Sequence, residues 1–175
     1  MRYGTFSSQR LKSTIALLAL VGAAASIPAK AGDLSFILNG KAVHLDDPAP
    51  GQKFNEKNWG AGLQYDFEPS DDGKWVPFIT AAGFSDSNKN PSYYAGGGVS
   101  RRFQPTGSSV HYDLGLVGFL MTREDFKGGS PFPGVLPVFS MGTESVAVNI
   151  TYVPDIAPKS VPLIFFQLKF RIASF

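Results

Sequence analysis

One histidine, one aspartate and one serine in this sequence have the side chains needed for ester or acyl chemistry. They are His44 and the neighbouring pair Asp86 and Ser87. Imidazole titrates near neutral pH and can take a proton from a hydroxyl, a carboxylate can fix the tautomer of the ring, and a serine can position or attack an ester. The same residues also fit a surface histidine and an ordinary Asp-Ser-Asn turn, so residue types alone leave both interpretations open.

The elements that must position these residues show alternation with period two after residue 31. In residues 59–68 the large apolar side chains fall on one face and the small or polar ones on the other, and residues 146–152 and 164–170 repeat the pattern. Such alternation predicts β-strands, and no segment shows the 3.6-residue spacing of an amphipathic helix. Eight strands are predicted, at about residues 34–44, 59–69, 74–86, 92–105, 109–121, 133–142, 144–153 and 161–170.

The connections between the predicted strands alternate in length. Short turns fall at 70–73, 106–108 and 142–144, longer loops at 45–58, 122–132 and 154–159, and residues 87–91 are intermediate. An even number of strands with alternating turns and loops is typical of outer-membrane proteins. We therefore predict an all-β fold, an eight-stranded antiparallel transmembrane outer-membrane β-barrel. A water-soluble, lipocalin-like barrel would also alternate and remains the alternative.

The first residues have the features of an export signal. Basic residues precede a short apolar run at 14–25, and Ala-Lys-Ala at 29–31 fits a cleavage site. We predict a cleaved signal peptide over residues 1–31, a barrel domain over residues 32–175 and an outer-membrane location. Four of the sixteen Lys and Arg residues lie before residue 32, which leaves twelve against fourteen Asp and Glu, a net charge of −2. This charge gives no reason to expect nucleic acid as a partner, and the absence of cysteine excludes disulfides.

The last residues break the alternation. Outer-membrane barrels usually end on an aromatic residue that continues the outward face of the last strand. Phe175 is terminal in this sequence but out of phase with Phe166, Leu168 and Phe170. Either a bulge intervenes or the last strand ends at Phe170.

The strand count brings distant polar residues to one end of the barrel. In a barrel of consecutive hairpins, the connections after the first, third and fifth strands share one rim. His44 ends the first strand, Asp86 and Ser87 end the third, and Arg123 follows the fifth. The three residues of the predicted chemistry therefore converge, together with a cation.

Four sequence stretches carry a resemblance to a known family. They are FNEKNWGAGL, GFSDSNKNPSYYAGGGV, MTREDF followed by PFPGVLPVFSMG, and NITYVPD, in this order. They resemble the PagP-type lipid A palmitoyltransferases over roughly residues 40–170. Cleavage after residue 31 would leave no room for the amphipathic helix that this family carries before its first strand, so the resemblance is to a divergent member.

The resemblance implies an activity and roles for the converging residues. The family is an eight-stranded outer-membrane barrel that moves a palmitoyl chain from a phospholipid to lipid A. By position, His44, Asp86 and Ser87 correspond to its catalytic residues, and Arg123 to its loop arginine. We expect His44 as general base, Asp86 to orient it or stabilise its cation, Ser87 to position the ester and Arg123 to bind a lipid headgroup. Ester-to-ester transfer needs no metal or organic cofactor, and we expect a monomer.

The run of glycines at 96–98 has two interpretations. In the family, a glycine corresponding to Gly98 forms the floor of a hydrocarbon pocket that selects acyl-chain length, so Gly96, Gly97 and Gly98 are predicted to line a pocket for a saturated chain. Alternatively, the glycines relieve crowding in a narrow, strongly bent barrel.

Prolines are implied to open the wall of the barrel to lipid. Proline lacks an N–H and so loosens strand pairing. Pro137 and Pro154 match one lateral gate of the family, whereas the second gate has Asn39 and Asn58 in place of proline. We expect one entrance to be altered or absent. A non-catalytic lipid-binding barrel and a lipid esterase that uses the same rim residues are the alternative functions.

Overall fold

A computed structural model describes residues 31–48, 50–51, 53–70, 72–155 and 161–175. The predicted signal peptide, residues 1–31, lies outside the described residues apart from Ala31, so it stays a prediction.

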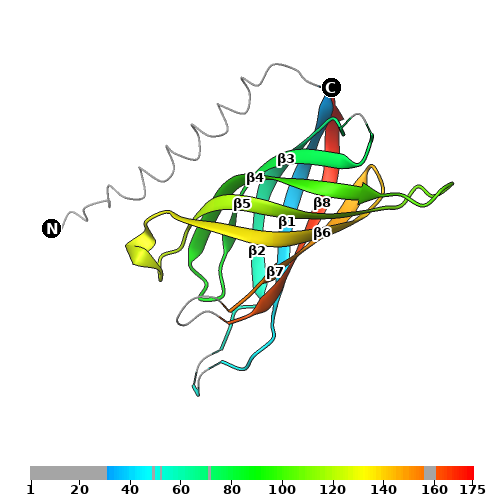
Figure 1. Ribbon diagram of the computed structural model, residues 1–175. Helices are drawn as coiled ribbons and strands as arrows, with labels where there is room; N and C mark the ends of the chain where they lie inside the picture. The colour runs from blue at the N-terminus through cyan, green and yellow to red at the C-terminus, as the bar shows by residue number, and fades with distance from the viewer. Residues whose placement is uncertain (1–30, 49, 52, 71, 156–160) are drawn as a thin grey trace. The chain divides into compact units, whose positions relative to one another are not determined.

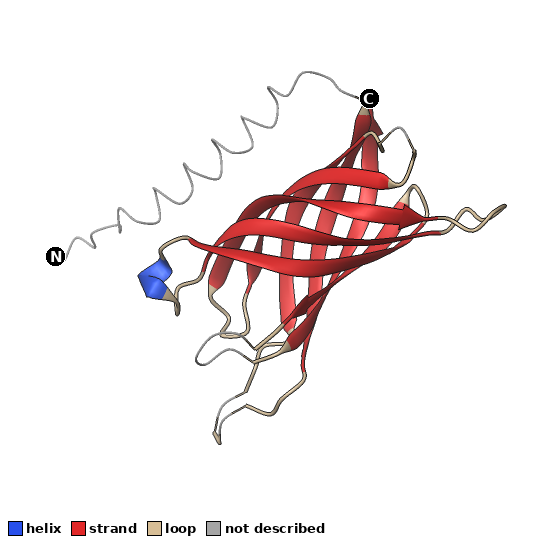
Figure 2. Ribbon diagram, viewed as in Figure 1, coloured by secondary structure: helices blue, strands red, loops and turns tan. Residues whose placement is uncertain are grey.

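The described chain forms a closed barrel of eight antiparallel strands in sequence order, with β8 paired to β1 (Figures 1 and 2). The predicted fold class is thus confirmed. The strands are β1 (Gly32–His44), β2 (Lys57–Phe67), β3 (Trp75–Ser85), β4 (Pro91–Phe103), β5 (His111–Thr122), β6 (Phe132–Gly142), β7 (Val146–Val153) and β8 (Leu163–Ser174). A short 3₁₀ turn, η1 (Lys127–Gly129), lies in the loop between β5 and β6. Among the described residues, no helix has the length and apolar character needed to cross a membrane.

Alternation along the strands separates the lumen of the barrel from its outer surface. The side chains that point inward are mostly polar and buried, including Asn39, Gln64, Asp113, Asn149 and Gln167. The side chains that point outward are large and apolar, and Leu114, Leu120 and Val135 are each more than half exposed (57, 59 and 65 %). A polar interior and an apolar exterior are the reverse of a soluble barrel and fit a membrane-spanning one.

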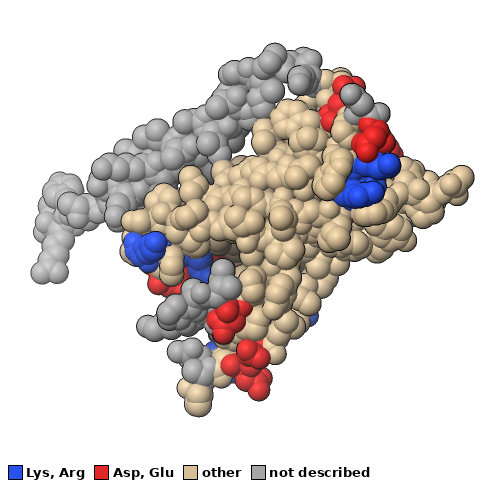
Figure 3. Space-filling view, viewed as in Figure 1, with Lys and Arg blue, Asp and Glu red and all other residues tan. Residues whose placement is uncertain are grey.

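Aromatic side chains lie on the outer surface near both ends of the barrel. The first set is Trp75, Phe103 and Tyr112, and the second is Trp59, Tyr93 and Tyr152. Amphipathic aromatic rings at two levels are typical of the two membrane interfaces. The charged side chains on the face seen in Figure 3 gather toward the two ends, with an uncharged band between them. We call the end at which β1 finishes with His44 the rim end, and the other the cavity end.

A bulge reconciles the last residues with the outward pattern. The pairing of β1 with β8 shifts between Leu34 and Ser35, opposite Arg171 to Ala173. Beyond the shift, Phe175 exchanges backbone hydrogen bonds with Gly32 and is 64 % exposed. The first of the two predicted explanations, a bulge, is therefore correct, and β8 does not end at Phe170.

The ladder between β6 and β7 covers only the cavity end. Its pairs run from Gly142 opposite Ala147 to Val138 opposite Thr151. Over residues 132–137 the described part of β6 pairs with β5 but not with β7, and the two strands diverge in Figure 1. This seam is thus unzipped toward the rim end.

Candidate active site

His44 and Ser87 are in direct contact at the rim end. His44 ends β1, Ser87 lies two residues beyond the end of β3, and the distance from His44 Nε2 to Ser87 Oγ is 2.8 Å. The two side chains are 43 residues apart in sequence, and the structure brings them together as the strand count predicted. A base and a hydroxyl at this distance can exchange a proton.

Asp86 lies beside this pair but is not hydrogen-bonded to the histidine. Its buried carboxylate accepts hydrogen bonds from the backbone N–H of Asn88 (2.8 Å) and Asn90 (2.9 Å) and from the Ser92 hydroxyl (3.2 Å). His44 Nδ1, the atom that an orienting carboxylate would contact, has no hydrogen-bond partner. Asp86 therefore stabilises the turn that presents Ser87, which differs from the predicted contact with the imidazole.

The His44 ring is held by an aromatic side chain that the sequence did not single out. Phe54, in the loop between β1 and β2, stacks on the imidazole with a centroid distance of 4.0 Å and an interplanar angle of 19°. This contact limits rotation of the ring while leaving Nε2 directed at Ser87. The residue falls in the stretch FNEKNWGAGL, whose residue types gave no signal of this role.

Arg123 joins two loops at the rim. Its guanidinium makes a bidentate ion pair with Asp125 at 3.1 and 2.9 Å, and its Nε lies 3.9 Å from Asp86 Oδ2. Asn88 adds a hydrogen bond to the same Asp125 carboxylate at 2.8 Å. The predicted headgroup ligand is thus near the His44–Ser87 pair, but two carboxylates already neutralise its charge.

The glycine run is split between the two faces of β4. Gly96 and Gly98 share the inward face with the buried Ser92 and Ser100, whereas Gly97 lies on the outward face. A Cβ on Gly98 would lie 2.6 Å from Cζ of Phe78, and one on Gly96 would lie 2.7 Å from Cα and Cβ of Phe119. These two glycines leave room for neighbouring aromatic residues, which favours the crowding interpretation, and Gly97 does not line the lumen.

Aromatic rings fill the lumen below the site. Phe84 lies 5.3 Å from Phe165 and 6.3 Å from Tyr94, measured between ring centroids. Deeper still, Gln167 donates hydrogen bonds to Tyr94 Oη (2.9 Å) and to Asn39 Oδ1 (2.6 Å). The lumen next to the site is therefore lined by aromatic rings, and a hydrogen-bonded polar cluster lies beneath them.

The two seams at which prolines or their replacements were predicted differ. Pro137 is the first β6 residue beyond the last β6–β7 pair, and Pro154 directly follows β7. Between β1 and β2, pairing continues past Asn39 to Lys41, and the next residue, Ala42, still donates its N–H to Glu56 O at 3.0 Å. The seam with prolines is open and the seam with asparagines is closed.

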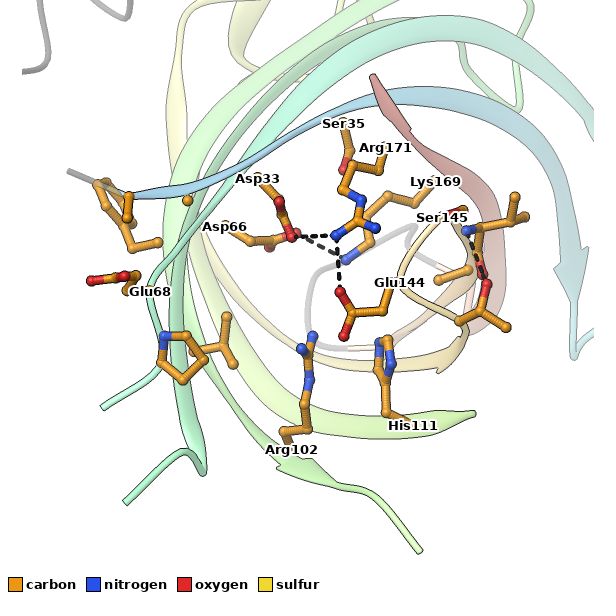
Figure 4. Close-up of a pocket in the computed structure, with 18 of the residues that line it drawn as sticks. Asp33, Ser35, Asp66, Glu68, Arg102, His111, Glu144, Ser145, Lys169 and Arg171 are labelled. Carbon is orange, nitrogen blue, oxygen red and sulfur yellow. Dashed lines mark hydrogen bonds and ion pairs between the residues drawn. The ribbon is translucent and has the colours of Figure 1, made fainter. Parts of the chain in front are cut away.

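A cavity of about 220 Å³ lies at the opposite end of the barrel (Figure 4). Ion pairs cross it: Arg171 contacts Asp33 (3.3 Å) and Glu144 (2.9 Å), and Lys169 contacts Asp66 (3.1 Å). Asp33 is near the start of β1 and His44 is at its end, so this charged cluster does not belong to the His44–Ser87 site. Its charges are paired with one another across the mouth of the lumen.

The sequence was compared with those of known protein families. Residues 44–168 match the family described as antimicrobial peptide resistance and lipid A acylation protein PagP. The chain belongs to the PagP family. All the residues predicted for the site lie within the matched segment, and the resemblance found from the four sequence stretches is confirmed.

Relatives named "Lipid A acyltransferase PagP" match part of the chain. The protein from Bordetella pertussis (strain Tohama I) is 34 % identical over 106 residues, which cover 59 % of this chain and 55 % of the relative. The protein from Methylobacillus flagellatus is 35 % identical over 104 residues, covering 58 % and 53 %. The chain thus spans about half the length of the curated relatives it matches.

Two solved structures are also similar. Neisserial surface protein A has a TM-score of 0.47 and 15 % identity, covering 82 % of this chain and 98 % of its own. Yersinia pestis outer membrane protein Ail has a TM-score of 0.42 and 13 % identity, covering 81 % and 99 %.

Proposed function

We propose that this PagP-family barrel is an outer-membrane acyltransferase that moves a fatty acyl chain from a phospholipid to lipid A. The observation that carries the proposal is the 2.8 Å contact between His44 Nε2 and Ser87 Oγ at the rim end, where the lumen is lined by aromatic rings. A base beside an aromatic-lined stretch of the lumen suits a substrate with a reactive ester and a long hydrocarbon tail. The relatives' names support lipid A as the acceptor.

The chain's own residues suffice for the proposed transfer. His44 takes the proton of the acceptor hydroxyl as the hydroxyl oxygen bonds to the carbonyl carbon of the donor ester. The old ester C–O bond breaks, and the leaving lysophospholipid oxygen receives the proton from His44. Ser87 positions the imidazole and the ester without becoming acylated. No electron is transferred, so the reaction needs no redox cofactor.

Asp86 and Arg123 have supporting roles in this proposal. The Asp86 carboxylate fixes the turn that carries Ser87, through its bonds to two backbone N–H groups. Arg123 binds a phosphate of the lipid headgroup in exchange for part of its pairing with Asp125. The acyl chain enters the lumen through the β6–β7 opening flanked by Pro137 and Pro154, and Gly98 sets the depth that it reaches.

The proposal also covers export and oligomeric state. Residues 1–31 serve as a signal peptide that is removed on the way to the outer membrane, as their basic, apolar and small-residue order suggests. The barrel closes on itself, and its unpaired strand edges are confined to the β6–β7 opening, which supports a monomer.

Mass spectrometry of lipid A tests the activity. The full-length protein is expressed in a Gram-negative host that lacks a comparable acyltransferase, alongside Ser87→Ala and His44→Asn. Ser140→Ala is a control for the loss of a serine hydroxyl, because Ser140 is a buried serine at the other end of the lumen. We expect an additional acyl mass on lipid A with the wild type and Ser140→Ala, and none with the two site variants.

Two results would overturn the proposed transfer. Folded wild-type barrel in the outer membrane with unchanged lipid A would leave a lipid-binding barrel. Release of free fatty acid and lysophospholipid without acylated lipid A would identify an esterase.

A further inference from the structure

The side chain of Asn58 bridges two strands at the rim end. Asn58 is 2 % exposed and lies near the start of β2. Its Oδ1 accepts a hydrogen bond from Ala42 N at 3.1 Å, and its Nδ2 donates one to Ser85 O at 2.8 Å. A backbone donor on one side and a backbone acceptor on the other fix the orientation of the amide.

The two hydrogen-bond partners of this amide lie at the same distance in sequence from the two reacting residues. Ala42 is two residues before His44 on β1, and Ser85 is two residues before Ser87 on β3. The amide of Asn58 therefore sets the spacing of the strand ends that carry the base and the hydroxyl. It does so without a hydrogen bond to either reacting group.

The loop before Asn58 reinforces the same arrangement. Asn55 donates its backbone N–H to Ser87 O (2.8 Å) and its side-chain amide to Asp86 O (2.9 Å). The neighbouring Phe54 stacks on the His44 ring. Residues 54–58 thus hold the imidazole on one side and the Asp86–Ser87 turn on the other.

We propose that Asn58 is a positioning residue that keeps His44 Nε2 within hydrogen-bonding distance of Ser87 Oγ. Loss of its amide leaves Ser85 O, which is close to the site, without this donor. Ala42 N keeps a second acceptor in Glu56 O at 3.0 Å, so β1 and β2 remain paired and the barrel stays closed. The loss therefore acts on the distance between the two reacting groups and not on the fold.

Nitrogen-15 NMR of histidine-labelled protein in nanodiscs tests the positioning directly. The chain has only two histidines, His44 and His111, and they lie at opposite ends of the barrel. His44→Asn assigns the two sets of ring signals. We expect Asn58→Ala and Asn58→Asp to move the His44 ring resonances toward those of a free imidazole and to leave the His111 resonances in place.

The variants and control make the outcome decisive. Asn58→Asp keeps the acceptor for Ala42 N but sets an oxygen against Ser85 O, so it removes the hydrogen bond to Ser85 O alone. Asn149→Ala removes another buried amide, whose side chain contacts Gln64 inside the lumen, and should not affect His44. Unchanged His44 signals in both Asn58 variants, or an equal change in Asn149→Ala, would overturn the inference. Asn58→Ser replaces any Asn58 variant that does not fold.

Kinetics adds a readout that rests on the proposed function. A displacement of about 1 Å between reacting groups costs on the order of 100-fold in rate. We expect Asn58→Asp to lower kcat by roughly 10- to 100-fold with KM nearly unchanged. If the wild type transfers no acyl chain, the proposed function fails while the NMR result still decides the role of Asn58. If Asn58→Asp keeps the wild-type kcat, the positioning role fails while the function stands.

Discussion

At the scale of the residue, the site contains a His–Ser contact, and Asp86 makes no hydrogen bond to the ring. The Asp86 carboxylate accepts hydrogen bonds from two backbone N–H groups and from the Ser92 hydroxyl, and it forms an ion pair with Arg123. His44 is held instead by the ring of Phe54 and by Ser87. The role of Asp86 is therefore to build the turn, and this differs from an aspartate that orients a catalytic imidazole.

Substitutions of Asp86 separate these two roles. Asp86→Asn keeps an oxygen that can accept from Asn88 and Asn90, whereas Asp86→Ala removes both bonds. Hydrogen bonds to a charged group contribute about 1.5–3 kcal/mol each, so we expect Asp86→Ala to lower the acylation rate by about 100-fold or more. Asp86→Asn should stay within about 10-fold of the wild type. The rate is measured with purified protein, phospholipid and lipid A in mixed micelles, and an equal loss in both variants would show that the negative charge itself is required.

The sequence predicted the convergence of these residues but not their bonds. In a barrel of consecutive hairpins, the strand count decides which strand ends share a rim. His44, Ser87 and Arg123 could therefore be placed at one rim. Which atoms meet depends on register, and the β1–β2 register shifts between Asn39 and Lys41. Alternation does not encode such a bulge. The bridging amide of Asn58 and the stacking of Phe54 follow from that local geometry and could not be predicted.

At the scale of the element, the inward face of β4 lacks side chains at two glycines, and aromatic residues of the adjacent strands lie beside them. The inward glycines Gly96 and Gly98 lie against Phe119 and Phe78, so the cross-strand partner supplies the side chain that the glycine lacks. The outward face holds the roomiest of these positions, since a Cβ on Gly118 of β5 would have Gly97 O as its nearest atom, at 3.9 Å, although one on outward Gly83 would lie 2.8 Å from the Tyr93 side chain. The tolerance of a glycine in this sheet should therefore follow the face on which it lies.

Alanine substitutions test that dependence on the face. Gly98→Ala places a methyl group against the Phe78 ring and the backbone of Leu116, and overpacking of this kind costs typically 1–3 kcal/mol. We expect its urea midpoint in detergent or lipid to fall, and Gly118→Ala, on the neighbouring strand, to unfold like the wild type. Equal midpoints would show that Phe78 moves aside freely.

A longer side chain at Gly98 tests the depth of the acyl pocket. Gly98→Met in the folded fraction should shift transfer toward shorter chains, because its side chain projects into the lumen beside Phe78. The acyl mass on lipid A measures the shift. An unchanged chain-length preference would leave the accommodation of Phe78 as the sole reason for this glycine.

At the scale of the whole molecule, the wall of the barrel is open at one seam near the rim end and closed by paired strands at the cavity end. Ion pairs among Arg171, Asp33 and Glu144 span the cavity end, and β6 pairs with β7 there. Toward the rim end, the described strands part at the β6–β7 seam while β1 and β2 stay bonded. Strand counting predicted the closed barrel because alternation and loop lengths report topology. The proline positions suggested which seam would open, because a residue without an N–H ends a ladder.

The opening between β6 and β7 predicts that lipid reaches the site through this seam. The chain has no cysteine, so an introduced pair forms the only disulfide. Pro137→Cys with Tyr152→Cys adds one rung beyond the last β6–β7 pair, Val138 opposite Thr151. Oxidation of this pair should close the opening and lower acyl transfer at least 10-fold, because a lipid tail could no longer pass the wall, and a reductant should restore transfer.

A second cysteine pair distinguishes closure of the seam from a general loss of flexibility. Lys41→Cys with Lys57→Cys crosslinks β1 to β2 at a rung that is already paired. This disulfide lies close to His44 along β1, yet it fixes strands that do not separate, so oxidation should leave transfer unchanged. Transfer that survives closure of β6–β7 but is lost on crosslinking β1 to β2 would assign the lipid path to the opposite seam. That result would make the bonding of Asn58 to Ala42 and Ser85 a gate that opens during the reaction.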